Sequence, residues 1–317
     1  MALQVVQELQ DKKILCVGLV CLDVVVFCKS YPEEDTDQRC LAHRWQQGGN
    51  AANNCTVLKQ LGVSCEYLGT MSTDYGGLFL KKCFIDSHID INNCVYYEET
   101  ECPMSCVLIN SQNGSRTILH SNNNLPELSC EEFKKINLKE YNWIHFEGRN
   151  VAEVCKMIQH IENWNENHPT DKIFVSVELE KAKTPLRELL DKADFVFIEK
   201  DFVKLFDIER METAVRELSQ MARQGSILIC PWGDLGACAC DIDGKLVLSP
   251  AYPPLKLVDT LGAGDTFVAA CIMGLRNGQS VEEAVTLGCK LAGAKCGLEG
   301  YSSLANVYEK VKEDKHK

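Results

Sequence analysis

Short apolar segments alternate with helix-like segments through the middle of the chain. Strands are predicted at residues 143–146, 172–177, 195–198 and 226–230, and helices at residues 151–166, 185–190 and 213–223. Strands that alternate with helices in this way pair in parallel and carry helices on both faces of one sheet. An apolar run at residues 14–20, preceded by Lys12 and Lys13, is typical of a further buried strand. The sequence therefore predicts an α/β protein with a doubly wound sheet, as one large domain over residues 1–317.

Two further segments have a different pattern and predict a small antiparallel β lid. Residues 24–45 mix β-branched and aromatic side chains with a charged turn, which is typical of exposed strands rather than of a helical crossover. Residues 104–120 hold two alternating runs around Asn113-Gly114, the preferred dipeptide of a tight hairpin turn. We expect inserts of about residues 22–48 and 95–122 to build the lid.

The remaining segments complete the predicted set of elements. Helices are expected at residues 50–61, 75–87 and 264–276, a strand at residues 65–70 and a hairpin at Asp243-Gly244. Gly62 is placed to end the first of these helices. The last helix is expected to begin at Ser280, because Glu283 completes a capping box there. This helix and the one predicted at residues 264–276 are expected to be the last two elements of the chain.

Charge and cysteine content restrict the expected partners and compartment. The 33 basic and 45 acidic side chains give a net charge of −12, so we expect neither a nucleic-acid nor a membrane partner. The N-terminal segment lacks the pattern of a secretory signal, and no apolar run approaches the roughly 20 residues of a membrane span. A cytoplasmic location is expected, where the 18 cysteines stay reduced and serve as small buried residues.

The strongest chemical signal is the turn Gly262-Ala263-Gly264-Asp265, between the strand-like residues 255–258 and an apolar helix. Small residues let backbone N–H groups approach a ligand, and the helix N-terminus adds positive potential, so the turn suits a phosphate group. Asp265 can accept a proton from a hydroxyl held against the same turn. The segment predicts an anion hole beside a general base. A glycine turn with a capping aspartate is the alternative, and a P-loop is excluded because its sequence pattern is absent.

A second polar group lies where a strand leads into a helix, at Gly48-Gly49-Asn50-Ala51-Ala52-Asn53. Asn50 and Asn53 are three residues apart and project from one face of the first helical turn, while Gly49 offers a backbone N–H. Carboxamides both donate and accept hydrogen bonds, as binding of a polyol requires. Asp23 would add an acceptor for paired sugar hydroxyls. A capped helix start beside a turn aspartate is the alternative.

Weaker signals point to a nucleotide. Gly233-Asp234-Leu235-Gly236 follows the strand predicted at residues 226–230, at the carboxyl end where ligands bind in open α/β sheets. Arg116 on the predicted hairpin can reach phosphate oxygens, or it is a solvated charge. Small residues on one face of the last helix, among them Gly288, would admit an adenine ring or pack closely against a neighbour.

Two of these segments resemble the signatures of the ribokinase (PfkB) family of sugar kinases. Gly48-Gly49-Asn50 and Asp259-Thr260-x-Gly262-Ala263-Gly264-Asp265 occur in the order and separation of that family. The resemblance covers about residues 13–304. Within the family, the fructose kinases are most similar, and the stretches that carry this likeness are residues 44–50, 114–119, 147–150 and 258–267.

The resemblance implies ATP-dependent phosphorylation of D-fructose at its 1-hydroxyl, with Mg²⁺ and often K⁺, by a homodimer that associates through the lids. It gives Asp265 the role of general base and residues 262–265 that of the anion hole. The implied sugar ligands are Asp23, Gly49, Asn50, Asn53 and Asp265. The implied ATP contacts are Arg116, Gly233, Asp234, Leu235, Gly236, Gly262, Ala263, Gly264 and, in the adenine pocket, Cys289.

One departure from the family concerns magnesium. Many members carry an Asn-x-x-Glu motif that organises the ion through water, and the corresponding stretch here is Glu199-Lys200-Asp201-Phe202, so no residue is assigned to the metal. A kinase for another sugar or a nucleoside, of ribokinase or adenosine kinase type, stays open, as does a catalytically silent ATP-binding scaffold. A dehydrogenase is a distant third, because Phe267 replaces the third glycine of the dinucleotide fingerprint.

Overall fold

The structure is a computed structural model that describes residues 12–241 and 243–314. Within these residues the main sheet has eight strands, in the order β14-β13-β12-β11-β10-β9-β1-β4. Its parallel strands are β1 (Lys13–Val17), β4 (Cys65–Leu68), β9 (Tyr141–Glu147), β10 (Phe174–Leu179), β11 (Phe195–Ile198) and β12 (Ile227–Pro231). The antiparallel strands β13 (Ala237–Cys240) and β14 (Leu246–Ser249) form one edge. The predicted doubly wound α/β sheet is confirmed.

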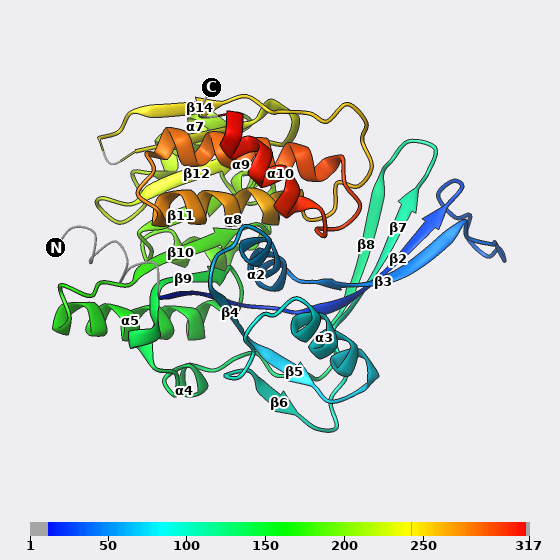
Figure 1. Cartoon of the computed structure of the whole chain (residues 1–317), viewed down its shortest axis with the longest axis horizontal. Coiled ribbons are helices and arrows are strands. Elements are labelled where there is room, and N and C mark those ends of the chain that lie inside the picture. Colours follow the sequence, from blue (N-terminus) through cyan, green and yellow to red (C-terminus); the bar gives the residue numbers. More distant parts are fainter. Residues whose placement is uncertain (1–11, 242, 315–317) are drawn as a thin grey trace.

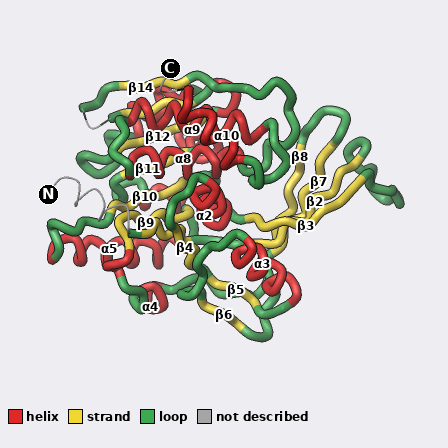
Figure 2. Tube along the Cα trace, in the orientation of Figure 1, coloured by secondary structure: helices red, strands yellow, loops and turns green. Residues whose placement is uncertain are grey.

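Helices cover both faces of this sheet (Figures 1 and 2). One face packs against α2 (Asn50–Gln60), α8 (Ala263–Arg276), α9 (Val281–Cys296) and α10 (Leu304–Asp314). The other packs against α4 (Cys130–Phe133), α5 (Val151–Asn167), α6 (Lys200–Val203) and α7 (Met211–Leu218). The strands are buried on both sides, which explains why they are apolar along their whole length rather than alternating.

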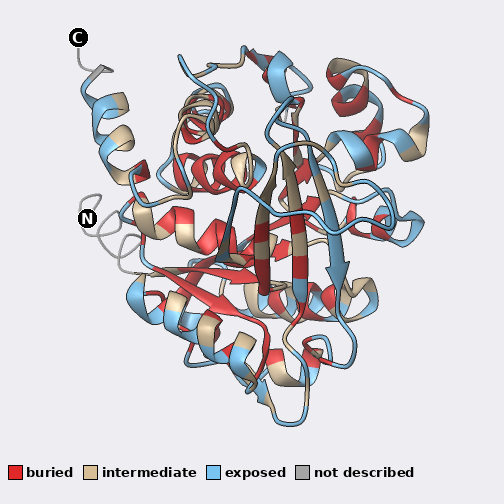
Figure 3. Ribbon diagram, turned by 90° about the vertical axis from the view of Figure 1, so that its right-hand side faces the viewer, coloured by how far each residue is buried: buried red, intermediate tan, exposed pale blue. Residues whose placement is uncertain are grey.

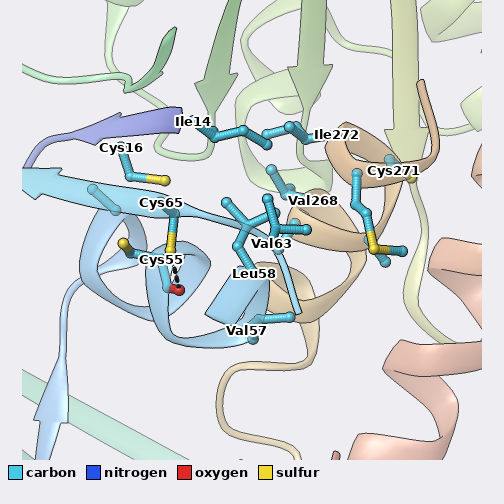
Figure 4. Packing of buried hydrophobic residues seen from close by; sticks show 14 of the residues in the cluster. Ile14, Cys16, Cys55, Val57, Leu58, Val63, Cys65, Val268, Cys271 and Ile272 are labelled. Atoms are coloured by element: carbon cyan, nitrogen blue, oxygen red, sulfur yellow. Dashed lines mark hydrogen bonds between the residues drawn. The ribbon is translucent and has the colours of Figure 1, made fainter. Parts of the chain in front are cut away.

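Cysteines fill part of the core between the sheet and α2 (Figure 4). Cys16 of β1, Cys55 of α2 and Cys65 of β4 are fully or almost fully buried, and the Cys65 thiol donates to the carbonyl oxygen of Cys55 at 3.3 Å. All 18 cysteines are free thiols, and most of them are buried. They act here as the small apolar residues that the sequence predicts.

A second sheet, with the strand order β3-β2-β7-β8, forms the lid. Its strands are β3 (Ala42–Gly48), β2 (Cys21–Cys28), β7 (Met104–Asn110) and β8 (Arg116–Ser121). The two inserts join because β2 pairs in parallel with β7, while β2–β3 and β7–β8 are antiparallel. The sheet projects from the body of the molecule, and its edge strand β8 is exposed along most of its length (Figures 1 and 3). The second insert was expected to begin at residue 95, but its first residues are not part of the lid sheet. They form β6 (Val95–Tyr97), which pairs with β5 (Thr70–Ser72) in a separate two-stranded sheet near α3 (Tyr75–Asp86).

Three local predictions are wrong. The α-helix expected at residues 185–190 is instead a 3₁₀ helix, Thr184–Leu189. In such short segments, i→i+3 hydrogen bonds can replace the i→i+4 bonds of an α-helix. Residues 255–258 form no strand, and they pair with none of the strands in the part of the chain that the structure describes. They form an exposed loop, and a hydrogen bond of 2.8 Å from the Val258 N–H to the Cys296 carbonyl oxygen attaches this loop to the end of α9. A third helix, α10, follows α9 at the C-terminal end and buries Leu304.

The shorter elements complete the description. The remaining 3₁₀ helices are η1 (Leu138–Glu140), η3 (Lys204–Phe206) and η4 (Gly233–Leu235). The capping box at Ser280 is present as predicted, with both reciprocal hydrogen bonds to Glu283. Among the residues that the structure describes, no helix is both long enough and apolar enough to cross a membrane.

Candidate active site

The two glycine-containing segments of the sequence meet at the junction of α2 and α8. Asn53, in the first turn of α2, donates from Nδ2 to Oδ2 of Asp265 at 2.7 Å. Asn54 donates from Nδ2 to the main-chain oxygen of Asp265 at 3.0 Å. Residues that are more than 200 positions apart therefore form one polar site, and it lies where the N-termini of two helices converge.

The turn before Asp265 has the backbone of an anion-binding loop. Gly262 is the N-cap of α8 and has a φ of 77°, a left-handed conformation that glycine adopts without strain. The first N–H groups of a helix have no acceptor within the helix. The Ala263 N–H donates to the Thr260 carbonyl oxygen at 3.3 Å, and the N–H groups of Gly264 and Asp265 that follow it are available to a ligand. A Cβ built on Gly262 would lie 1.8 Å from the Tyr301 hydroxyl, so this position has room for glycine alone. Sequence reasoning did not identify Tyr301, which lies after α9.

Asp265 is buried, with 8% of its surface exposed. Burial raises the pKa of its carboxyl group to about 7; the Asn53 hydrogen bond acts to lower it, and the charges of Glu180, Glu147 and Asp23 act to raise it. A carboxylate whose pKa lies near neutral pH is matched to the task of taking a proton from a hydroxyl group.

Asp23 of the lid strand β2 lies beside the glycines that precede α2. A Cβ built on Gly48 would lie 2.3 Å from the Asp23 carboxyl group, so only glycine fits there. Gly49 has a φ of 96°, and a Cβ on it would lie 2.3 Å from the carbonyl oxygen of Leu19. Burial raises the pKa of Asp23, while hydrogen bonds from Cys21, Ser105 and Gln46 act to lower it. The lid thus contributes a buried acceptor to the site.

Asn50 contacts a group of carboxylates that sequence reasoning missed. Its Nδ2 donates to Glu180 Oε2 at 3.0 Å and to Glu178 Oε2 at 3.3 Å. Glu147 and Glu199 belong to the same group, because their charges act on the Glu178 carboxyl group. Glu147 is the last residue of β9 and Glu178 the second-last of β10, while Glu180 directly follows β10 and Glu199 directly follows β11. Carboxyl ends of neighbouring parallel strands lie along one edge of a sheet, and this position was the signal available for Glu178 and Glu180.

Glu199 has the environment of an uncharged carboxyl group. Burial raises its pKa to about 8, and the charges of Glu180 and Asp265 act in the same direction. Its Oε1 is buried without a hydrogen-bond partner, and a Cβ built on Gly264 would lie 3.7 Å from that atom. Within the described residues, no three His, Cys, Asp or Glu side chains are grouped closely enough to hold a metal ion directly.

The turn of residues 233–236, which is predicted to contact a nucleotide, follows the carboxyl end of β12. Gly233, Asp234 and Leu235 form the exposed helix η4, directly after Trp232. A Cβ on Gly236 would lie 2.1 Å from the Ser249 carbonyl oxygen. Burial raises the pKa of the Cys289 thiol, and the neighbouring Ser249 side chain acts to lower it. The turn and Cys289 therefore adjoin the same strand, β14. Cys289 is buried in α9, with 6% of its surface exposed.

Arg116 lies at the start of β8 and extends from the lid to the glycine turn. Its Nη1 donates to Thr260 Oγ1 at 2.6 Å, two residues before Gly262. The structure thus brings Asp23, Asn53, Arg116 and Asp265 to one region. Their individual roles in binding and catalysis stay predictions.

Lys295 is a further residue that the sequence pattern did not reveal. It lies in the last turn of α9 with its side chain fully buried. Its Nζ donates to the Asp259 carbonyl oxygen at 2.9 Å and pairs with Asp259 Oδ2 at 3.2 Å. Asp259 Oδ1 in turn accepts from the Leu261 N–H at 2.9 Å. A buried ion pair therefore shapes the loop that leads into the glycine turn.

Comparison with known proteins gives a consistent assignment. The pfkB family of carbohydrate kinases matches residues 11–306. A ketohexokinase of Mus musculus is 43% identical over 297 residues, which cover 93% of this chain and 100% of that protein. A nucleoside kinase of Methanocaldococcus jannaschii is 23% identical, covering 96% of this chain and 98% of that protein.

Solved structures show the same fold. Arabidopsis thaliana ribokinase, solved with ribose and ATP, superposes with a TM-score of 0.78 at 17% identity, over 94% of this chain and 99% of that one. Ribokinase of Giardia lamblia gives a TM-score of 0.81 at 13% identity, over 96% and 99%. With a family match over almost its full length, the ribokinase-like fold and a buried aspartate at the glycine turn, the chain belongs to the pfkB family of carbohydrate kinases.

Proposed function

We propose that the chain transfers the γ-phosphoryl group of ATP to the 1-hydroxyl of D-fructose. The single observation that carries this proposal is the contact between Asn53 and Asp265, which joins a polyol-binding helix start to a base at an anion-binding turn. The choice of fructose rests on the 43% identity to a ketohexokinase over that protein's whole length.

Asp265 is the general base of this reaction. The oxygen of the sugar hydroxyl forms a bond to the γ-phosphorus, the bond from that phosphorus to the bridging oxygen of ADP breaks, and the hydroxyl proton passes to the Asp265 carboxylate. The N–H groups of residues 262–265 donate to the oxygens of the transferred group, where negative charge is concentrated. Positioning and charge stabilisation supply most of the acceleration, because phosphoryl transfer needs little other covalent chemistry.

The sugar lies between the lid and the start of α2. Asp23 accepts from two neighbouring hydroxyls, Asn50 and Asn53 bind others, and the Gly49 N–H donates to a further oxygen. The proximity of Asp23 and Asn53 to Asp265 supports this arrangement, because the charge of Asp23 acts on the same carboxyl group that Asn53 contacts.

ATP lies on the other side of the glycine turn. Arg116 and the turn residues Gly262, Ala263 and Gly264 contact its phosphates, while Gly233, Asp234, Leu235 and Gly236 lie along the nucleotide. The adenine ring packs near Cys289, next to β14. The Arg116–Thr260 hydrogen bond supports this placement of the phosphates, because it already holds a cation beside the turn.

Magnesium fits the carboxylate group around Glu178, Glu180 and Glu199. Carboxylate oxygens are the ligands that Mg²⁺ prefers, and the unpartnered Glu199 Oε1 faces the glycine turn. Because these side chains are not grouped as a direct metal site, they would hold the ion through its water molecules. Bound Mg²⁺ neutralises charge on the phosphate oxygens. Activation by K⁺ stays a prediction, to be tested by comparing turnover in potassium and sodium salts.

We also propose that two chains associate through the outer face of the lid. Trp45, Val24, Cys106 and Leu119 lie opposite one another across its four strands and form an apolar row. Trp45 and Leu119 are 52% and 60% exposed. An exposed apolar row of this kind is typical of a surface that is covered in an assembly. We place the protein in the cytoplasm, whose reducing conditions suit its free thiols.

A panel of acceptors tests the proposed function. The chain is incubated with ATP, Mg²⁺ and, in turn, fructose, ribose, adenosine and no acceptor, and ADP release is measured. We expect the highest kcat/KM with fructose. Turnover of ribose or adenosine without turnover of fructose would reject the fructose assignment, and ATP binding without turnover of any acceptor would favour a silent scaffold.

A further inference from the structure

Arg44 connects the lid to the loop that carries the anion hole. Its Nη2 is 3.0 Å from Asp259 Oδ2, and its Nη1 is 2.6 Å from Glu299 Oε1. The guanidinium thus bridges two carboxylates, one before α8 and the other after α9. Arg44 belongs to β3, the strand that ends at Gly48 and continues directly into the first residues of α2.

Arg44 shares the inner face of the lid with a proposed sugar ligand. Val25 pairs with Arg44 and Asp23 pairs with Gln46, so Asp23 and Arg44 project from the same face of the sheet. Arg44 Nε donates to Gln46 Oε1 at 2.9 Å, and its guanidinium lies 5.3 Å from the centre of the Phe27 ring. These contacts fix the direction in which the long side chain leaves the strand.

Asp259 connects the lid to the loop that leads into the glycine turn. Its Oδ2 contacts both Arg44 and Lys295, while its Oδ1 accepts from the Leu261 N–H, one residue before Gly262. Burial acts to raise the pKa of Asp259, but the Lys295 charge and the Leu261 N–H outweigh it and lower that pKa. The carboxylate therefore stays charged at neutral pH, and its orientation sets that of the turn.

The two cations on Asp259 have different roles. Lys295 is fully buried and compensates the Asp259 charge from within the core. Arg44 comes from the lid, and its second partner, Glu299, has a side chain that is 71% exposed. The Arg44–Glu299 pair is exposed, and exposed ion pairs contribute little to stability. The Asp259 carboxylate is buried, but it keeps its contact with Lys295 when Arg44 is replaced, so we expect the fold to tolerate the loss of the bridge. The bridge links β3, and with it the helix start that carries Asn50 and Asn53, to the loop before the anion hole.

We propose that Arg44 is a positioning residue for phosphoryl transfer: by bridging Asp259 and Glu299, it holds the sugar-binding face of the lid in register with the anion hole. This rests on the proposed function. Lysine cannot replace it fully, because a point charge reaches one carboxylate at a time whereas the planar guanidinium reaches two. A displacement of about 1 Å between the acceptor hydroxyl and the γ-phosphoryl group can cost on the order of 100-fold in rate.

The test compares Arg44→Met with Arg44→Lys and with Arg210→Met. Arg210 pairs with Glu212 at 3.5 Å at the start of α7 and is the matched control, an arginine–glutamate pair that touches neither lid nor loop. For Arg44→Met we expect kcat/KM for the sugar to fall by about 10- to 100-fold, through both KM and kcat, with the melting temperature little changed. Arg44→Lys should fall between this variant and the wild type, and Arg210→Met should match the wild type.

Glu299→Gln provides a double-mutant cycle. If Arg44 acts through its bridge, Glu299→Gln lowers kcat/KM in the wild-type background and has no further effect once Arg44 is replaced. Hydrogen exchange without substrates gives a readout that is independent of catalysis: the amides of residues 258–262 should exchange faster in Arg44→Met than in Arg210→Met.

The outcomes separate the two proposals. Wild-type kinetics in Arg44→Met, or additive effects of the Arg44 and Glu299 changes, would overturn the positioning role. Unchanged exchange at residues 258–262 would overturn it as well, whatever the enzyme phosphorylates. A wild-type protein that phosphorylates no sugar would reject the proposed function, while the exchange measurement would still decide whether Arg44 holds the loop.

Discussion

Asn53 Nδ2 lies 2.7 Å from Asp265 Oδ2, and this hydrogen bond joins the first turn of α2 to the first turn of α8. It places a donor on the side chain that we assign as the base. Burial is the main cause that raises the pKa of this carboxyl group to about 7, and the charges of Glu180, Glu147 and Asp23 act in the same direction. The Asn53 amide therefore opposes burial and the neighbouring carboxylates, and the balance keeps the pKa of Asp265 near neutral.

Replacing Asn53 with alanine should move the pH profile of the enzyme. The Asn53 hydrogen bond favours the ionised form of Asp265, so its loss raises the pKa of Asp265 above 7. Activity requires the ionised base and falls as the pH drops through that pKa, so the acidic limb of the kcat/KM profile should shift to higher pH by roughly one unit. The measurement is kcat/KM between pH 5.5 and 9.5.

Asn54→Ala is the matched control for this shift. Asn54 donates to the main-chain oxygen of Asp265 and not to its carboxylate, so the acidic limb should stay in place in this variant. A limb that moves equally in both variants, or in neither, would contradict the role that we give to the Asn53–Asp265 hydrogen bond.

Asp265→Asn should separate catalysis from nucleotide binding. The amide keeps the shape of the side chain but cannot take the hydroxyl proton, so kcat should fall by about 100- to 10,000-fold. The glycine turn is unchanged, and ATP affinity measured by calorimetry should stay within a few-fold of the wild-type value. Turnover within a factor of ten of wild type would exclude Asp265 as the base.

Glu199→Gln should change how stability depends on pH. The carboxyl of Glu199 has a pKa of about 8 in the folded protein and an ordinary value of 4.5, so between these values the folded state holds a proton that the unfolded state has released. The wild type therefore loses stability as the pH rises from 4.5 to 8. The glutamine variant avoids this loss. Between pH 5 and pH 8, its free energy of unfolding should therefore fall by on the order of 2–4 kcal/mol less than that of the wild type.

Urea unfolding at pH 5 and pH 8 measures this difference. Glu309→Gln is the control, because Glu309 is exposed on α10 and its replacement should leave the wild-type pH dependence intact. Equal pH dependence in the wild type and in Glu199→Gln would show that the carboxyl of Glu199 is charged in the folded protein.

The apolar row on the lid predicts a dimer. Light scattering should give a mass of twice 35.5 kDa for the wild type. Leu119→Glu places a charge on the outer face of the edge strand β8 and should give a mass of 35.5 kDa, because a charge in an apolar interface is costly. Glu131→Gln on α4, away from the lid, should remain dimeric. A monomeric wild type would contradict the interface.

Much of the fold follows from local sequence patterns. The β-α alternation predicts the parallel sheet, Asn113-Gly114 predicts the lid hairpin, and Ser280 with Glu283 predicts the start of α9; the structure has all three. Local sequence patterns gave wrong predictions where the secondary structure of a segment depends on the segments that pack beside it. Residues 255–258 have a strand-like composition, but among the described residues they pair with no strand and form an exposed loop.

The site was predictable only in part, for a related reason. Glycine turns and the asparagines of α2 have recognisable spacings, and the structure brings them together. Glu178 and Glu180 have no such signal, because their contact with Asn50 depends on the order of strands in the sheet. Arg44 and Asp259 are 215 residues apart, and no local pattern links the two members of such a pair.

The position of the phosphate on the product tests the central claim most directly. Phosphorus and carbon NMR of the product formed from fructose and ATP distinguishes phosphorylation of the 1-hydroxyl from that of the 6-hydroxyl. We predict a single product, fructose 1-phosphate, formed with one equivalent of ADP and absent when Asp265→Asn replaces the wild type. A 6-phosphate, or ADP release without any sugar phosphate, would contradict the proposal that Asp265 activates the 1-hydroxyl of fructose.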